Sequence, residues 1–371
     1  MNQEKIAFVI HGFPMGGAEK FLINLVNHFY RLEYKPLVIL LSEEKVLLNE
    51  LDNRIKVSFI LKKSRFDFFV SRRIKSTIKK EKIKKVFCVN TYSFFLTKLF
   101  FLFDRSTQFF LSPHSTIPIS KKNFWQNILY FRLLSKSDIV IYLCKNQKEY
   151  LQQKYFYKSK SDHIIYNGID TQYYNPQIVQ NILSPSLKTT FSILNNEFVI
   201  VQVARLQEEK RHVDAIDALF FLHNHFNTKA HLLLVGSGEK AYADFLQQYV
   251  QKKKLQQYVH FVGNQNDVRK FYCIADIFTL TSNSETFSLA ALEAMSFGLP
   301  VSLTDVGGAK EMMIEGVTGL LSQPNNIKSI AGSWHQLLHS NIKGQFIRKY
   351  VTEQFGLDRM LQQYVELVGN G

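Results

Sequence analysis

Hydrophobic and polar positions follow each other along this chain in an order that predicts short strands separated by helices. Short, almost continuous apolar runs are typical of parallel strands covered on both faces, and the longer segments between them carry apolar residues at helical spacing. The expected strands are residues 5–11, 36–42, 56–61, 85–90, 108–114 and 138–144, followed by 197–204, 231–236, 259–263, 276–282 and 300–305.

The alternation is interrupted between residues 177 and 195, where no period is visible. A chain of 371 residues is also longer than one hydrophobic core usually serves. We therefore predict an α/β protein with two doubly wound, Rossmann-like domains that face a cleft, followed by a helical C-terminal segment. The expected parts are residues 1–176, a linker at 177–195, residues 196–350, and a helix at 351–371 that packs back on the first domain.

The composition is that of a globular protein, with 46% hydrophobic and 21% charged residues. No uncharged apolar run reaches the length of about 18 residues that a spanning helix needs, and the first residues do not have the pattern of a secretory signal. Three scattered cysteines, without a C-x-x-C pair, favour neither a disulfide framework nor a zinc site. We expect a cytoplasmic protein with no bound metal and no cofactor.

Ligands of open α/β sheets bind outside the carboxyl ends of the strands, so the loops after the strands hold the candidate chemistry. The loop after the first strand, "HGFPMGGAEK", places Gly16 and Gly17 before a helix. Bare backbone N–H groups and a helix N-terminus there suit an anion. A plain strand-to-helix turn is the alternative interpretation.

In the second half, the loop "ARLQEEKRH" follows an expected strand and carries Arg205 and Lys210. Two cations in one loop can hold a diphosphate, the arginine as a planar fork and the lysine as a point charge. An ordinary basic loop would look the same.

The segment "TSNSETFSLAALEAMSFGLPV" contains two carboxylates eight residues apart, Glu285 in a strand-to-helix turn and Glu293 on the helix. The helix start near residues 287–289 offers N–H groups to a phosphate, and the carboxylates can accept hydrogen bonds from sugar hydroxyls. Alternatively, Glu285 caps the helix and Glu293 is a buried, paired structural acid.

Taken with "NGID", "VGSGE", "VHFVGNQNDV" and "DVGGAKEMMIEGVTGLL", these motifs resemble glycosyltransferase family 4, whose members are retaining enzymes of the GT-B fold. The spacing of Glu285 and Glu293 matches the E-x7-E motif of that family. The resemblance covers the second domain almost completely, whereas in the first it depends mainly on "GGAEK" and "PHS". Thr286 and Ser288 stand where the family commonly has glycine, which puts the donor preference in question.

The resemblance implies a role for each matched residue. The cations grip the diphosphate and stabilise the leaving group, the first acid contacts the transferred sugar, and the second holds the ribose. The residues expected to act in catalysis are His114, Arg205, Lys210 and Glu285. Those expected to bind the donor are Gly16, Gly17, Val262, Asn264, Phe287, Ser288, Leu289 and Glu293.

What the resemblance implies is a metal-independent, retaining transfer from a nucleotide-sugar, with a UDP-sugar favoured, to a saccharide or lipid-linked acceptor in cell-surface polysaccharide synthesis. The first domain is expected to bind the acceptor and the second the donor. The chain has no D-x-D pair, the usual metal–diphosphate ligand of the other common transferase fold. The alternatives are an inactive partner subunit of a polysaccharide synthase and a GT-B nucleotide-sugar epimerase.

The net charge of +15 is concentrated in residues 51–160, which hold 24 Lys and Arg against 6 Asp and Glu. The centre of this basic region mixes cations with Phe66, Phe68, Phe69 and Val70. Cations interleaved with aromatic residues suit an anionic membrane surface, and we favour peripheral binding to the inner face of the membrane. A solvated helix face is the second interpretation, and nucleic acid is disfavoured because no nucleic-acid-binding motif accompanies the charge.

Overall fold

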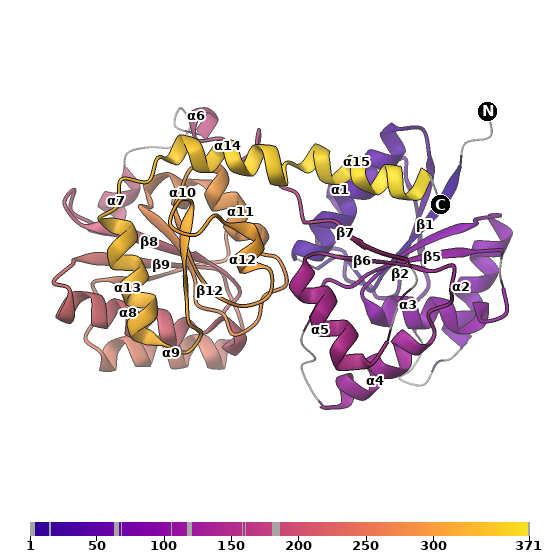
Figure 1. The fold of residues 1–371 in the computed structure, drawn as a ribbon, viewed down its shortest axis with the longest axis horizontal. Coiled ribbons are helices and arrows are strands. Elements are labelled where there is room, and N and C mark those ends of the chain that lie inside the picture. The colour runs from indigo at the N-terminus through magenta and orange to yellow at the C-terminus, as the bar shows by residue number, and fades with distance from the viewer. Residues whose placement is uncertain are drawn as a thin grey trace. The chain divides into compact units, whose positions relative to one another are not determined.

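The computed structural model describes residues 4–14, 16–62, 67, 69–104, 106–116, 121–157, 159, 161–179 and 186–369. The chain divides into two compact units, of which unit 1 comprises Met1–Asn167 and Met360–Gly371 and unit 2 comprises Gly168–Arg359. In Figure 1 each unit is a twisted sheet with helices on both faces. The segment expected to be a linker, 177–195, is part of unit 2 and includes two short helices, α6 (Pro176–Val179) and α7 (Ser186–Thr190).

Unit 1 contains, in its described residues, a seven-stranded parallel sheet in the order β3-β2-β1-β4-β5-β6-β7. Its strands are β1 (Lys5–Ile10), β2 (Lys35–Leu40), β3 (Lys56–Phe59), β4 (Lys85–Val89), β5 (Gln108–Ser112), β6 (Ile139–Tyr142) and β7 (Ser161–Ile164). Its helices are α1 (Gly17–Arg31), η1 (Leu48–Glu50), α2 (Phe69–Lys80), α3 (Thr91–Lys98), η2 (Leu99–Phe101), α4 (Lys121–Arg132) and α5 (Lys145–Tyr155), with most of α15 (Leu357–Gly369).

Both faces of the unit 1 sheet are buried, which explains why its central strands are apolar without alternation. On β1, Ala7 and Val9 join the core under α2 to α5, whereas the ring of Phe8 lies 5.7 Å from that of Phe29 on α1. Tyr364 of α15 packs on the same face as α1, with its ring 5.3 Å from that of Phe21. The last helix therefore completes the core of unit 1.

Unit 2 contains a six-stranded parallel sheet in the order β10-β9-β8-β11-β12-β13 within the part of the chain that is described. Its strands are β8 (Phe198–Val203), β9 (Ala230–Val235), β10 (Val259–Gly263), β11 (Ile277–Leu280), β12 (Val301–Thr304) and β13 (Gly319–Ser322). Its further helices are η3 (Glu208–Lys210), α8 (His212–His225), α9 (Lys240–Lys252), α10 (Arg269–Ile274), α11 (Leu289–Ser296), α12 (Ala309–Met312), α13 (Ile327–Leu338) and α14 (Gly344–Phe355).

The prediction of two doubly wound sheets with helices at the C-terminus is confirmed. In both units the chain winds outward from a central pair of strands, β1 and β4 in unit 1 and β8 and β11 in unit 2. Such a reversal of strand order leaves a crevice at the carboxyl ends of the two central strands. Among the described residues, no helix is both long and apolar enough to cross a bilayer.

Candidate active site

The candidate site of unit 2 lies where its strand order reverses, at the carboxyl ends of β8 and β11. The loop after β8 carries the two predicted cations, and the loop after β11 carries the first predicted acid. Lys210 Nζ donates a hydrogen bond of 2.6 Å to Glu285 Oε1, and both side chains are about four-fifths buried, with 18% exposed. Two residues 75 positions apart in sequence thus form one ion pair.

Hydrogen bonds fix these two loops to each other. Thr281 Oγ1 donates to the carbonyl oxygens of Lys210 and Arg211, and the Asn283 N–H donates to the carbonyl of Glu209. Ser282 Oγ donates to Glu285 Oε1, the same oxygen that receives Lys210. Glu285 Oε2 has no hydrogen-bond partner among the described residues, so this oxygen can accept a bond from a ligand.

Arg205 is exposed at the start of the same loop and forms no ion pair with a described residue. Its position is set by close backbone packing against the loop after β9. A Cβ at Gly236, where φ is +142°, would collide with the carbonyl of Ala204, and the Leu206 N–H donates to the carbonyl of Ser237 over 2.9 Å. The buried imidazole of His212 follows two residues after Lys210, and its burial and the Lys210 charge lower its pKa to about 4.

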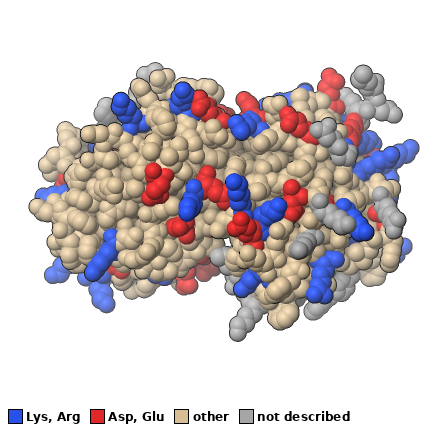
Figure 2. Space-filling model, in the orientation of Figure 1, with Lys and Arg blue, Asp and Glu red and all other residues tan. Residues whose placement is uncertain are grey.

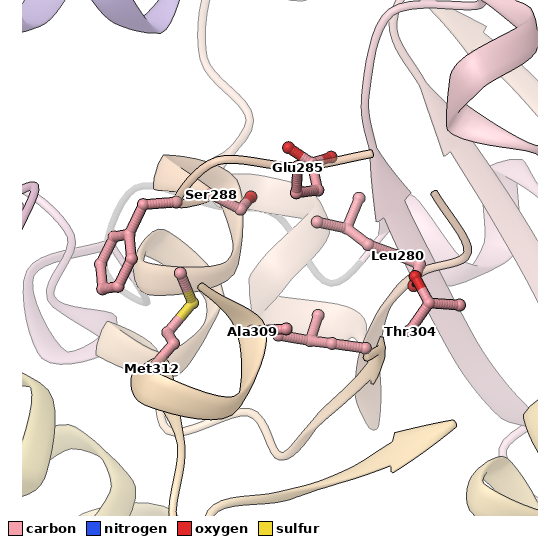
Figure 3. Close-up of a pocket in the computed structure, with 8 residues that line it drawn as sticks. Leu280, Glu285, Ser288, Thr304, Ala309 and Met312 are labelled. Carbon is pink, nitrogen blue, oxygen red and sulfur yellow. The ribbon is translucent and has the colours of Figure 1, made fainter. Parts of the chain in front are cut away.

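The start of α11 is capped by Ser288, whose Oγ accepts a hydrogen bond of 3.3 Å from the Ala291 N–H. The alternative that Glu285 caps this helix is therefore wrong, since the carboxylate is bonded elsewhere. Leu289 is the first helical residue, and the side chain of Phe287 is buried with its ring 5.5 Å from that of Phe355. Figure 3 shows the Glu285 carboxylate at the rim of a small, largely apolar pocket, pointing away from the side chains of Ala309 and Met312.

The backbone of Glu285 rests against the loop after β12. Gly307 has a φ of +56°, and a Cβ there would overlap the carbonyl oxygen of Glu285. The N–H of Gly308 donates 2.8 Å to the carbonyl of Thr286. The glycine pair in "DVGGAKE" thus supports the turn that presents the acid.

Glu293 is buried on α11 and its two oxygens accept hydrogen bonds of 2.9 Å from two tyrosine hydroxyls, Tyr174 to Oε1 and Tyr272 to Oε2. This buried and paired environment is the one that the structural alternative expected for Glu293. Burial, reinforced by the Glu293 charge, raises the pKa of both phenols, which keeps them protonated as donors. Sequence reasoning missed both tyrosines, although "TQYYNP" and "KFYC" were visible as aromatic clusters.

Val262 and Asn264 lie at the end of β10 and just after it, with Val262 half-buried and Asn264 exposed. The side-chain amide of Gln265 donates to the Val262 carbonyl over 3.2 Å. The Gly236 N–H donates a hydrogen bond to the carbonyl oxygen of Gly263. This end of β10 is therefore joined to the loop that supports Arg205.

In unit 1, the predicted residues also follow the strand reversal. Gly16 and Gly17 lie at the start of α1, where Gly16 is the N-cap residue. His114 follows β5, and its backbone N–H donates 2.8 Å to Asn90 Oδ1 at the end of β4. Its ring lies 4.5 Å from that of Phe21, one turn into α1.

Burial lowers the pKa of His114 to about 3, so the imidazole is neutral at physiological pH. Its Nε2 lies 3.3 Å from Ser112 Oγ. The structure thus brings Lys210 and Glu285 together in unit 2 and places His114 near the start of α1 in unit 1. No group of three or more His, Cys, Asp or Glu side chains within the described ranges is placed to hold a metal ion.

Two family descriptions match this chain, and together they cover most of it. "Glycosyltransferase Family 4" matches residues 15–173, and "Glycosyl transferases group 1" matches residues 187–354. The chain belongs to the family 4-like glycosyltransferases of the GT-B fold. The prediction of family and fold is confirmed.

Several relatives of this glycosyltransferase are similar over part of their length. It is 31% identical to N-acetyl-alpha-D-glucosaminyl L-malate synthase of Bacillus anthracis, over 56% of this chain and 53% of that protein. It is 24% identical to UDP-Gal:alpha-D-GlcNAc-diphosphoundecaprenol alpha-1,3-galactosyltransferase of Escherichia coli, over 62% of this chain and 61% of that protein. The chain therefore matches little more than half of the length of such relatives.

Solved structures share the fold of this glycosyltransferase over its whole length. The Anabaena protein HepE in complex with UDP has a TM-score of 0.83 at 21% identity, covering 99% of this chain and 100% of that one. WaaG, a glycosyltransferase involved in lipopolysaccharide biosynthesis, has a TM-score of 0.72 at 16% identity, covering 99% and 100%.

Proposed function

We propose that this glycosyltransferase is a retaining, metal-independent hexosyltransferase. It moves a sugar from a nucleotide-sugar, with a UDP-sugar favoured, to a saccharide or lipid-linked acceptor in cell-surface polysaccharide synthesis. The observation that carries the proposal is the Lys210–Glu285 pair at the strand reversal of unit 2. The choice of donor is supported by HepE, which was solved with UDP and with UDP-glucose, and by the E. coli relative named for a UDP-Gal donor.

The diphosphate is held, in this proposal, by Arg205, Lys210 and the first N–H groups of α11. Lys210 has three N–H donors and gives one of them to Glu285, which leaves two for phosphate oxygens. Exposed Arg205 supplies a second cation from the same loop. The N–H groups of Phe287, Ser288 and Leu289 lie at the positive end of the helix dipole, where an anion is stabilised.

The sugar and nucleoside ends are held by the two acids. Glu285 contacts the transferred sugar through Oε2, because Oε1 is already bonded to Lys210 and Ser282. Glu293, which two tyrosine hydroxyls hold in place on α11, is proposed to accept hydrogen bonds from the ribose hydroxyls. Val262 and Asn264, at the end of β10, are the part of the site proposed to touch the nucleobase.

Unit 1 is proposed to bind the acceptor. Gly16 and Gly17 offer bare backbone at the start of α1 for approach to the donor phosphates, and His114 serves as a neutral hydrogen-bonding group near the reacting sugar. A neutral imidazole can donate with one ring nitrogen and accept with the other, so it orients hydroxyls without repelling a cationic site.

The chemical step is the loss of a nucleoside diphosphate, on which two negative charges build up. Two cations and a helix N-terminus aimed at those oxygens stabilise the developing charge. Because no side chain stands out as a nucleophile, we favour departure and attack on the same face of the sugar, which gives retention. The departing phosphate then accepts the proton of the acceptor hydroxyl.

The test is donor hydrolysis and sugar transfer by Arg205→Ala and Lys210→Ala. Each change should reduce turnover by about two to three orders of magnitude, as for loss of one charge-stabilising donor. Lys240→Ala is the matched control, because Lys240 is exposed on α9 and, among the described residues, forms an ion pair only with Asp244, four residues away. Near-normal turnover in both site variants contradicts the proposal. Metal independence is tested separately with EDTA, and it is contradicted if EDTA abolishes activity and a divalent ion restores it.

The same assay separates the alternatives. An inactive partner subunit would neither hydrolyse nor transfer from a nucleotide-sugar, and an epimerase would convert the donor without an acceptor. We further propose that the enzyme is cytoplasmic and binds peripherally to the inner face of the membrane, a location that the cationic region 51–160 favours. No interaction with nucleic acid is proposed.

A further inference from the structure

We propose that unit 1 docks on an anionic bilayer through an apolar loop at the amino-terminal edge of its sheet, formed by Phe100, Leu102 and Phe103. The inference rests on the proposed peripheral location and names the surface and the lipid chemistry responsible for it. The loop follows α3 and leads into β5.

The apolar loop is exposed to a degree that a soluble surface does not require. Phe103 is 100% exposed, Leu102 46% and Phe100 41%, whereas Phe101 between them is buried in the core. Phe101 anchors the turn and so forces its neighbours outward. Contiguous exposed apolar side chains mark an interaction surface, and here they stand at a tip of the unit.

Lysines lie around the apolar loop. Lys75 Nζ on α2 donates to the carbonyl of Phe100 over 2.7 Å, and Lys79 is paired with Asp104 just after the loop. Lys98, which directly precedes η2, bonds Ser135, so the turn before β6 is also adjacent. Exposed cations on the turns at this edge that form no ion pair with a described residue are Lys80, Lys82, Lys84 and Lys136.

The acids nearest the apolar loop are neutralised by lysines, whereas Glu33, exposed in the turn before β2, forms no ion pair with a described residue. Asp104 is neutralised by Lys79, buried Asp138 by Lys98, and Glu81 by Lys56. The edge therefore has more unpaired cations than unpaired acids around the apolar loop. Such a surface is complementary to anionic lipid. The face drawn in Figure 2 shows cations interspersed with acids.

The start of α2 fits this role less well than the sequence suggested. Val70, which the sequence grouped with the phenylalanines as part of a membrane-facing surface, is fully buried in the core of unit 1, so it does not belong to that surface. Arg73 is bonded to Asp67 and to the Leu61 carbonyl. Phe69 is exposed, and Arg65, Phe66 and Phe68 lie outside the described residues.

The docking edge is the opposite edge of the sheet from His114. The two are separated by the parallel strand β5, whose five residues span about 16 Å at about 3.3 Å per residue. An acceptor sugar must therefore lie at some distance from the bilayer surface to reach His114. This geometry favours a lipid-linked saccharide of several sugars over a lipid whose accepting hydroxyl lies at the headgroup.

Co-sedimentation with vesicles of equal phosphatidylglycerol and phosphatidylcholine tests the docking surface. The full-length protein should bind at low salt and be released as salt rises, because exposed charges are screened. Phe100→Ser with Phe103→Ser should weaken binding at least about tenfold, and Lys80→Gln, Lys82→Gln and Lys84→Gln together should weaken it about a hundredfold. The control is Phe245→Ser with Phe346→Ser, two rings of unit 2 that are each about half exposed.

The depth to which the apolar loop enters the bilayer is measured by the quenching of tryptophan fluorescence with brominated lipids. The variants are made in a Trp125→Phe background, where buried Trp334 gives a constant signal. The fluorescence of the Phe103→Trp variant should be quenched, and that of the Phe69→Trp variant should not. Absence of vesicle binding by the unmodified protein, equal binding by the Phe100/Phe103 variant, or quenching at 69 alone would overturn the proposal. Donor hydrolysis without vesicles is measured in parallel, so a failure of docking is distinguished from a failure of the proposed reaction.

Discussion

At the scale of single residues, Glu285 and Glu293 have the same chemical group and opposite environments. Glu285 is partly exposed and keeps one oxygen without a hydrogen-bond partner among the described residues, whereas Glu293 is buried between two tyrosine hydroxyls. Replacing Glu293 with Gln should weaken UDP binding by about one to two orders of magnitude, since a hydrogen bond to a charged group is lost. Glu285→Gln should leave UDP affinity within about threefold and reduce sugar transfer about a hundredfold.

Calorimetric titration with UDP and a transfer assay measure the two effects separately. Tyr272→Phe is the control for a purely structural contribution, because it removes a donor to Glu293 and keeps the carboxylate. Equal losses of UDP affinity in the two Gln variants would refute the division of labour between the acids.

Much of the site could be predicted from residue identity, because cations, acids and glycines in the loops that follow parallel strands are typical of a ligand-binding site. Lys210 and Glu285 were both expected in the site, and the structure pairs them. The partners of Glu293 could not be predicted, since Tyr174 lies 119 residues away and reaches it only through the fold. The cap at Ser288 shows the reverse case, in which a short-range hydrogen bond decided against Glu285 as the capping residue.

At the scale of elements, the turn that carries Glu285 depends on the loop after β12. Gly307→Ala introduces a Cβ that overlaps the Glu285 carbonyl, at a φ of +56°. We expect at least a tenfold loss of turnover together with a lower Tm. Gly316→Ala is the matched control, since its φ is +75° and a Cβ there has no atom within 4 Å.

Gly316→Ala should lower the free energy of unfolding only by the conformational penalty of a left-handed non-glycine residue, about 1–2 kcal/mol. Its turnover should be unchanged. A transfer assay and thermal denaturation of both variants measure this difference. If the two alanine variants lose turnover equally, backbone strain alone accounts for the effect and the contact with Glu285 does not position the acid.

Strands with continuous apolar runs were predictable, but two edge strands were not. β7, with the sequence "SDHI", is half-exposed, and β13 consists of four residues that begin with a glycine. Edge strands bury only part of their side chains, so they lack the apolar run that identifies a central strand. The helices α6 and α7 were missed for a related reason, because helices of four and five residues are too short to show a period.

At the scale of the whole molecule, the sequence gives a net charge for residues 51–160 but not its distribution. Arg73, Lys79 and Lys98 are engaged in ion pairs within unit 1, so they add less to the surface field than their number suggests. Of the exposed cations outside these pairs, Lys80, Lys82, Lys84 and Lys136 lie at the amino-terminal edge of the sheet. Which part of a cationic region faces outward is decided by packing, and a sum over the sequence cannot show it.

The division of the chain into two units has a consequence for thermal unfolding. Tyr364 on α15 belongs to the core of unit 1, where it is fully buried against Phe21 and Phe87. Tyr364→Ala should lower the free energy of unfolding by about 3–5 kcal/mol by analogy with other aromatic truncations, which lowers the Tm of unit 1 by roughly 6–20 °C. UDP at a hundred times its Kd should instead raise the Tm of unit 2, with a stabilisation of about 2.7 kcal/mol.

Differential scanning calorimetry of the full chain measures both shifts in one experiment. The expected result is two transitions, of which Tyr364→Ala lowers one and UDP raises the other. Phe346→Ala is the control, because this ring is half-exposed on α14 of unit 2 and its loss should leave the unit 1 transition in place. If the Tyr364 variant and UDP shift the same transition, the nucleotide site cannot lie in unit 2 alone, and the assignment of the diphosphate to Arg205 and Lys210 fails with it.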